Sequence, residues 1–132
     1  MIKFNALIPE LTVCDIAKTK AFYIDLLGFT LEYEREEDTF VFLSFQGSQL
    51  MFEQYGINGW HTADLAYPYG RGVNFEIGVA DVESLYLRIT KAGITPFRPL
   101  KTNTYRQGAH SIPQKEFLIQ DPDGYLLRFV EA

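Results

Sequence analysis

The chain has 132 residues, of which 47% are apolar and 15% aromatic, and its formal net charge is −5. This length is typical of a single domain with a sizeable hydrophobic core. The acidic balance argues against nucleic acid as a partner, because binding to phosphates needs a basic surface.

The first half of the chain predicts a strand at residues 8–13, a helix, and then three more strands. Asp15 is a good N-cap, since its carboxylate can accept hydrogen bonds from the free amides of a first helical turn. Gly28 is a candidate for the left-handed position that ends a helix. The strand-like runs that follow are 29–34, 39–45 and 49–55.

The second half repeats this order. Asp81 corresponds to Asp15 and Gly93 to Gly28, with one residue of slack between the two copies. The helix after Asp81 carries apolar residues at i, i+3, i+4 and i+7, which is the spacing of one buried face. These residues are Val82, Leu85, Tyr86 and Ile89. The predicted strands of this half are 94–98, 115–120 and 125–130.

The repeat predicts an α+β fold in which each half is a βαβββ module. Module one covers residues 4–55, and module two covers 71–132. The two are joined by a connector at 56–70, and the whole chain is expected to form one domain. The connector has no clear periodicity. We expect a second long loop at 99–114, and loops of such length are usually functional or mobile.

The chain shows no sign of export or of membrane insertion. Cys14 is the single cysteine, so no internal disulfide can form. The longest apolar runs fall short of the roughly 18 residues of a membrane-spanning helix. The N-terminal residues lack the apolar stretch of a signal peptide, and we therefore expect a cytoplasmic protein.

The stretch "DPDGYLLRF" at 121–129 predicts a tight turn followed by a strand. Asp121, Pro122 and Gly124 are the residue types that the successive positions of a β-turn favour. The strand after the turn contains one cation, Arg128, among apolar residues.

Three motifs together resemble the vicinal oxygen chelate superfamily, which includes glyoxalase I, extradiol dioxygenases, fosfomycin-resistance enzymes and bleomycin-resistance proteins. They are "LTVCDIAKTKAFYIDLLGF" (11–29), "NFEIGVADVESL" (74–85) and "DPDGYLLRF". The resemblance implies that the two modules form a curved, half-open mixed sheet with a crevice.

The metal-ligand positions of that superfamily do not carry ligands here. The resemblance places them at Ile8, Asn74 and Arg128, and at Met51 or Glu53 in the first module. An arginine would repel a metal ion, because it stays protonated at any working pH. We therefore expect no metal, no cofactor and no catalytic residue, which favours a binding protein over an enzyme.

Within the superfamily, the chain is most similar to the bleomycin-resistance proteins. "IPELT" (8–12) resembles their first strand, with Pro9 at the position of their proline, and "KEFLIQDPDG" (115–124) resembles their penultimate strand and turn. The resemblance implies a homodimer in which the first strand crosses to the partner subunit. It also implies antibiotic resistance by sequestration of a glycopeptide-like drug, without catalysis, in a crevice between subunits.

Strand alternation then predicts which side chains line the crevice. The expected ligand-binding residues are Glu10, Thr12, Trp60, Tyr67, Asn74, Glu76, Tyr105 and Arg128. Ile8 should lie with them. The alternate residues should pack on the helices: Leu7, Pro9, Leu11, Val13, Val73, Phe75, Ile77 and Val79. An acidic crevice edge favours a positively charged ligand, and aromatic residues on loops can stack on its rings.

Several alternatives stay open at this point. Arg128 can pair with Glu10 or Glu76, contact a ligand, or face solvent. An unusual carboxylate site of Glu10, Glu53 and Glu76, joined by His61 or His110, would make the protein an enzyme. The chain could also bind another metabolite, or only dimerise.

Overall fold

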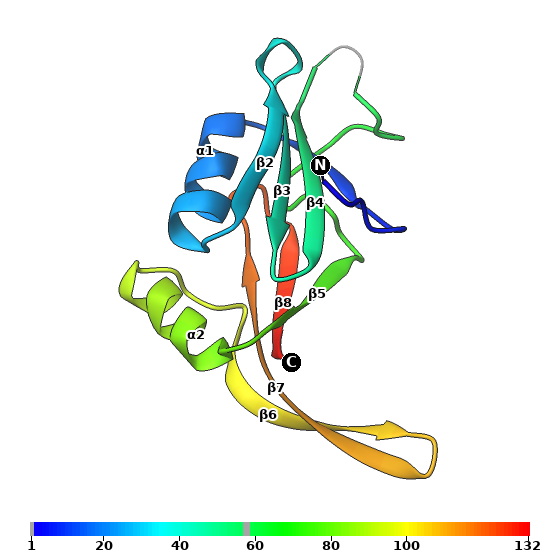
Figure 1. The fold of residues 1–132 in the computed structure, drawn as a ribbon, viewed down its shortest axis with the longest axis vertical. Coiled ribbons are helices and arrows are strands. Elements are labelled where there is room, and N and C mark those ends of the chain that lie inside the picture. Colours follow the sequence, from blue (N-terminus) through cyan, green and yellow to red (C-terminus); the bar gives the residue numbers. More distant parts are fainter. Residues whose placement is uncertain (1, 57–58) are drawn as a thin grey trace. The chain divides into compact units, whose positions relative to one another are not determined.

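A computed structural model of the chain describes residues 2–56 and 59–132 (Figure 1). Two positions of the predicted connector, 57 and 58, lie outside these residues. The chain forms two compact units, Met1–Tyr69 and Gly70–Ala132.

The first unit contains a four-stranded mixed sheet with one helical segment. The strand order is β1-β4-β3-β2, with β1 parallel to β4 and the other pairs antiparallel. In chain order the elements are β1 (Glu10–Val13), α1 (Ile16–Lys20), the π-helical turn η1 (Ala21–Leu26), β2 (Thr30–Arg35), the 3-10 turn η2 (Glu36–Asp38), β3 (Phe40–Phe45) and β4 (Ser48–Gln54).

The helical segment is held at both ends by the residues that the sequence indicated. Asp15 accepts hydrogen bonds from the amides of Ala17 and Lys18 at 2.9 and 3.4 Å. Gly28 follows the last turn with φ of 90°, a conformation that glycine adopts at little cost. Tyr23 is fully buried, and its ring lies 4.5 Å from that of Phe52 in β4. Burial of this aromatic face fixes the segment to its sheet.

The second unit repeats this topology. Its strand order is β5-β8-β7-β6, with β5 parallel to β8 and the other pairs antiparallel. The elements are β5 (Asn74–Val79), α2 (Val82–Lys91), β6 (Arg98–Gln107), β7 (His110–Gln120) and β8 (Leu126–Glu131). The predicted α+β class and the two βαβββ modules are confirmed.

Helix α2 begins and ends as predicted. Asp81 accepts a hydrogen bond from the Ser84 amide at 3.1 Å, and the apolar stripe is buried against the sheet. At its other end, the amides of Gly93 and Ile94 donate to the carbonyls of Thr90 and Ile89. This pair of bonds is a Schellman motif, and Gly93 provides its left-handed residue with φ of 85°.

The predicted loop at 99–114 is wrong, because these residues form most of a long β-hairpin of β6 and β7. The predicted strand at 94–98 is also misplaced, since β6 begins only at Arg98. Figure 1 shows the hairpin extending well past β8. Much of it is exposed, so the residues show no apolar alternation that would indicate a strand. Gly108, with φ of 60°, makes its two-residue turn.

The turn before β8 is confirmed. The Gly124 amide donates to the Asp121 carbonyl at 2.9 Å. The buried carboxylate of Asp121 accepts from the amides of Asp123 and Tyr125, each at 2.9 Å. The turn therefore fixes the start of β8 and, with it, the strand position of Arg128.

Strand alternation sorts the side chains correctly within β1 and β5, but not before them. Leu11, Val13, Ile77 and Val79 are buried as predicted. Leu7 and Val73 were expected to pack on the helices, but they are 82% and 49% exposed in the single chain. Both precede the first paired residue of their strand, where the pleat no longer dictates direction. No helix of the described residues is long and apolar enough to cross a membrane.

Candidate functional site

A groove of about 470 Å³ lies on one face of the second sheet. Strands β5, β6, β7 and β8 all contribute to it, because side chains at alternate positions of paired strands share a face. The polar lining residues are Asn74, Arg98, Lys101, Asn103, Glu116 and Arg128. The apolar and aromatic ones are Phe97, Pro99, Tyr105 and Leu118.

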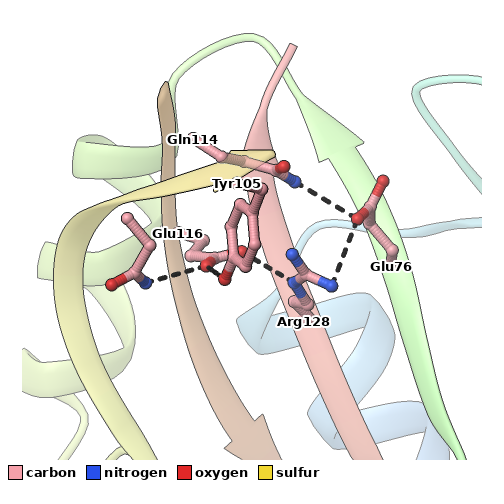
Figure 2. A network of polar contacts seen from close by, with 6 residues as sticks. Glu76, Tyr105, Gln114, Glu116 and Arg128 are labelled. Atoms are coloured by element: carbon pink, nitrogen blue, oxygen red, sulfur yellow. Dashed lines mark hydrogen bonds and ion pairs between the residues drawn. The ribbon is translucent and has the colours of Figure 1, made fainter. Parts of the chain in front are cut away.

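The centre of the groove is an ion pair between Arg128 and Glu116. The Nε of Arg128 lies 2.6 Å from Oε1 of Glu116, and Figure 2 shows the two side chains meeting across neighbouring strands. Glu116 is 2% exposed, and the side chain of Arg128 is 24% exposed. A carboxylate so deeply buried needs a partner, since an unpaired charge in the interior is very costly.

The second oxygen of Glu116 is also satisfied. Its Oε2 accepts a hydrogen bond from Nδ2 of Asn103 at 2.8 Å and another, unusually short, from the hydroxyl of Tyr105. Burial by itself raises the pKa of Glu116, but these hydrogen bonds and the charge of Arg128 outweigh it and lower the pKa below its ordinary value. Glu116 is therefore a permanent anion at neutral pH.

Arg128 also contacts a second carboxylate. Its Nη1 lies 3.4 Å from Oε1 of Glu76, which also accepts from the side-chain amide of Gln114 at 3.2 Å. The guanidinium carbon lies 5.3 Å from the centre of the Tyr105 ring, within cation–π distance. The hydrogen bond to Glu116 is the largest cause that raises the pKa of Arg128.

Pairing with Glu76 is one of the alternatives that the sequence leaves open for Arg128, and the structure contains this pair. Sequence reasoning missed the closer partner, Glu116. The sequence predicts a strand at residues 115–120, and alternation along it places Glu116 and Leu118 on the same face. The register pairs Leu118 directly with Arg128, so the neighbouring carboxylate could have been found by pairing the two predicted strands. Asn103 could not have been found in this way, because the sequence predicts a loop at 99–114.

Two further cations line the groove. Within residues 2–56 and 59–132, no carboxylate lies within ion-pair distance of Arg98 or Lys101. The guanidinium carbon of Arg98 lies 4.8 Å from the centre of the Phe97 ring, so its charge is held near the groove by an aromatic contact.

The residues at this site do not fit a metal ion. The position where the family resemblance places a glutamate carries Arg128, whose charge would repel a cation. Both oxygens of the neighbouring Glu116 already accept hydrogen bonds. Across the described part of the chain, no three His, Cys, Asp or Glu side chains gather closely enough to hold one.

The other predicted site residues lie in the first unit. Glu10 and Thr12 are on β1, and the register places Thr12 opposite Glu53 of β4. Partial burial, followed by repulsion from Glu53, raises the pKa of Glu10, while Arg35 opposes this rise. Trp60 and Tyr67 are 87% and 63% exposed.

The predicted carboxylate site is not assembled within either unit. Glu10 and Glu53 belong to the first sheet, whereas Glu76 belongs to the second unit and pairs there with Arg128. His61 stacks on the ring of Tyr55 at 5.0 Å. His110 and Tyr105, both expected on a loop, lie on β7 and β6.

Comparison with known proteins agrees with the observed topology. A family model described as the Glyoxalase/Bleomycin resistance protein/Dioxygenase superfamily matches residues 5–129. Bleomycin resistance proteins of Geobacillus stearothermophilus and Staphylococcus aureus are 29% identical to this chain, with 94% of each chain covered.

Two solved structures share the fold at lower identity. TioX of Micromonospora sp. ML1 has a TM-score of 0.75 at 18% identity, with 97% of this chain and 98% of that chain covered. A glyoxalase/bleomycin resistance protein/dioxygenase of Alicyclobacillus acidocaldarius has a TM-score of 0.67 at 24% identity, with 97% and 91% covered. The repeated βαβββ topology and the family match over almost the whole chain lead to one conclusion: the chain belongs to the glyoxalase/bleomycin resistance protein/dioxygenase superfamily.

Proposed function

We propose that this chain is a metal-free small-molecule-binding protein of the bleomycin-resistance type, which sequesters a glycopeptide-like drug without changing it chemically. One observation carries the proposal. Arg128 lies where the family resemblance leads us to expect a metal-binding glutamate. It forms an ion pair with the buried Glu116 beside an open groove. The name of the curated relatives, bleomycin resistance protein, supports the choice of drug.

The groove has the properties of a ligand site. Its volume of about 470 Å³ falls within the range of small-molecule pockets. Phe97 and Tyr105 offer flat rings on which a heteroaromatic group can stack. Asn74 and Asn103 offer amide groups for hydrogen bonds that orient the ligand. The ion pair beneath them is satisfied internally, so it forms a rigid floor for binding.

We also propose that the protein is a homodimer that exchanges its first strand, with the ligand bound between subunits. In the single chain, the carbonyl of Pro9 accepts a hydrogen bond from the Met51 amide at 2.9 Å, so the segment before β1 already follows β4, which would be an edge strand without β1. The same contact made with the β4 of a partner would produce the exchange. The exposed Phe4 and Leu7 in this segment would gain burial from it.

The test is calorimetric titration of chelator-treated protein with bleomycin. The drug is added in two forms, metal-free and copper-loaded. Saturable binding of about one drug per subunit, at micromolar affinity or tighter, is the expected result. Absence of binding at high drug concentration would refute the assignment to bleomycin while leaving the fold unaffected.

A pair of variants locates the binding site. Leu118→Trp places a large ring in the groove and should weaken binding by obstructing part of it. Ser111→Trp adds the same ring on β7, on the face opposite to Glu116 and Leu118, and should leave binding unchanged. Thermal melting of both variants shows that each is folded. Equal affinity of the two variants would exclude the groove as the drug site.

A further inference from the structure

The charges in the groove of the second unit do not match the positively charged ligand that the sequence suggested. That expectation depended on Glu10 and Glu76 as an acidic crevice edge. Glu76 instead pairs with Arg128. The lining itself contains three cations, Arg98, Lys101 and Arg128, against the single carboxylate Glu116. With Glu76 counted as the second carboxylate in contact with Arg128, the groove has a formal excess of one positive charge, although the whole chain carries −5.

These cations have donors available for a ligand. Arg98 and Lys101 have no carboxylate partner in the described part of the chain. Arg128 has five N–H donors, and its contacts with Glu116 and Glu76 do not use all of them. Arg98 and Lys101 are exposed, so water and salt partly screen their charges, and each is expected to attract an anion with the strength of a surface ionic contact.

The neighbouring side chains favour an aromatic anion over a bare inorganic one. Phe97 and Tyr105 provide two rings in the same groove, and Leu118 adds apolar surface. A planar carboxylate also matches the fork of an arginine guanidinium, which can bind both oxygens at once.

We infer that this groove recognises small aromatic carboxylates, with Arg98 and Lys101 binding the carboxylate and the rings beside them binding the aromatic part. The inference builds on the proposed role of the groove as a small-molecule site. It differs from the bleomycin assignment in the class of ligand, so the two can fail separately.

The experiment uses a matched pair of probes, 2-naphthoate and 2-naphthamide, which share one ring system and differ in charge. Calorimetric titration of the full chain should show about tenfold tighter binding of the carboxylate than of the amide, the equivalent of one good ionic contact. Raising NaCl from about 50 to about 500 mM should weaken naphthoate binding and leave naphthamide binding unchanged, because salt screens only the charged probe. Equal affinity for the two probes, or no naphthoate binding up to about 5 mM, would overturn the inference.

Variants identify the cations responsible. Arg98→Gln and Lys101→Gln should each weaken naphthoate binding about threefold to tenfold and leave naphthamide binding unchanged. Arg106→Gln is the matched control, since Arg106 lies on the same strand, β6, outside the groove lining. An equal loss in all three variants, or no loss in the first two, would overturn the inference.

The bleomycin titration and the naphthoate titration test two separate proposals. Naphthoate binding that follows these rules, in a protein that does not bind bleomycin, would keep the carboxylate site and reject the drug. The reverse result would keep drug sequestration and reject the carboxylate site.

Discussion

Arg128→Met tests whether the ion pair in the groove holds the second unit together. The substitution removes the charge and keeps a long unbranched side chain that can cover the same surface. Glu116, 2% exposed, then loses its charged donor but keeps the hydrogen bonds from Asn103 and Tyr105. Breaking a fully buried pair costs about 3–5 kcal/mol, and one charge-assisted hydrogen bond contributes about 1.5–3 kcal/mol. Because two donors remain, we expect a loss of about 2–3 kcal/mol at pH 7.

Urea denaturation followed by far-ultraviolet circular dichroism measures this loss. Lys20→Met is the control, since it breaks the Lys20–Glu34 pair, whose side chains are 37% and 27% exposed. A pair with this exposure contributes less than about 1 kcal/mol. The double variant Arg128→Met/Glu116→Gln should be less destabilised than the sum of the single variants, because the second change removes the uncompensated charge. If Arg128→Met cost no more than the control, our account of the groove as a rigid, internally satisfied floor would be wrong.

Three further predictions concern pH and backbone geometry. The pKa of Glu116 is lowered on folding, so its contribution to stability is present above the ordinary carboxyl pKa and is lost as pH falls through the folded pKa. Glu116→Gln should remove this dependence. A plot of the free energy of unfolding against pH should then be flatter on its acid side. The pKa of Glu10 is raised on folding, so its effect has the opposite sign, and stability is lost as pH rises from about 4.5. Glu10→Gln should therefore raise the melting temperature more at pH 7 than at pH 4. An equal rise at both pH values would contradict this cause. Gly93→Ala should lower the free energy of unfolding by about 1 kcal/mol, measured by urea denaturation, because Gly93 has a positive φ. Gly78→Ala is the control and should lower it less, because Gly78 has no positive φ. Similar losses in the two variants would argue against the Schellman geometry as the cause.

The first-order features of the fold followed from local chemistry. Asp15 and Asp81 are capping residues that need only the amides of the next turn, and Gly28 and Gly93 need only their own freedom in φ. The turn before β8 is closed by Asp121, whose carboxylate bonds to amides two and four residues away. Each of these interactions joins residues that are close together in the chain, so it can be predicted from the local sequence.

The hairpin of β6 and β7 shows the limit of this reasoning. Its residues pair from Arg98–Leu118 to Gln107–His110, with a shift of register between Arg98 and Lys101. Their side chains are mostly exposed, and Pro99 and Pro113 suggest breaks. Nothing in the hydrophobic pattern distinguishes such a ribbon from a loop, because the pattern reports burial and not backbone pairing. The error concealed Asn103 and misplaced Tyr105.

The sequence by itself determined the two βαβββ modules, the caps and turns, and the presence of Arg128 where the family resemblance leads us to expect a glutamate. Each of these depends on residue identity and on contacts between near neighbours in the chain. The tertiary structure alone decided that Asn103 and Tyr105 complete the hydrogen bonds of Glu116, and that Arg98 and Lys101 make the groove cationic. The physical reason is strand register: which side chains meet across a sheet depends on how separate strands align, and a strand must first be recognised before its register can be considered.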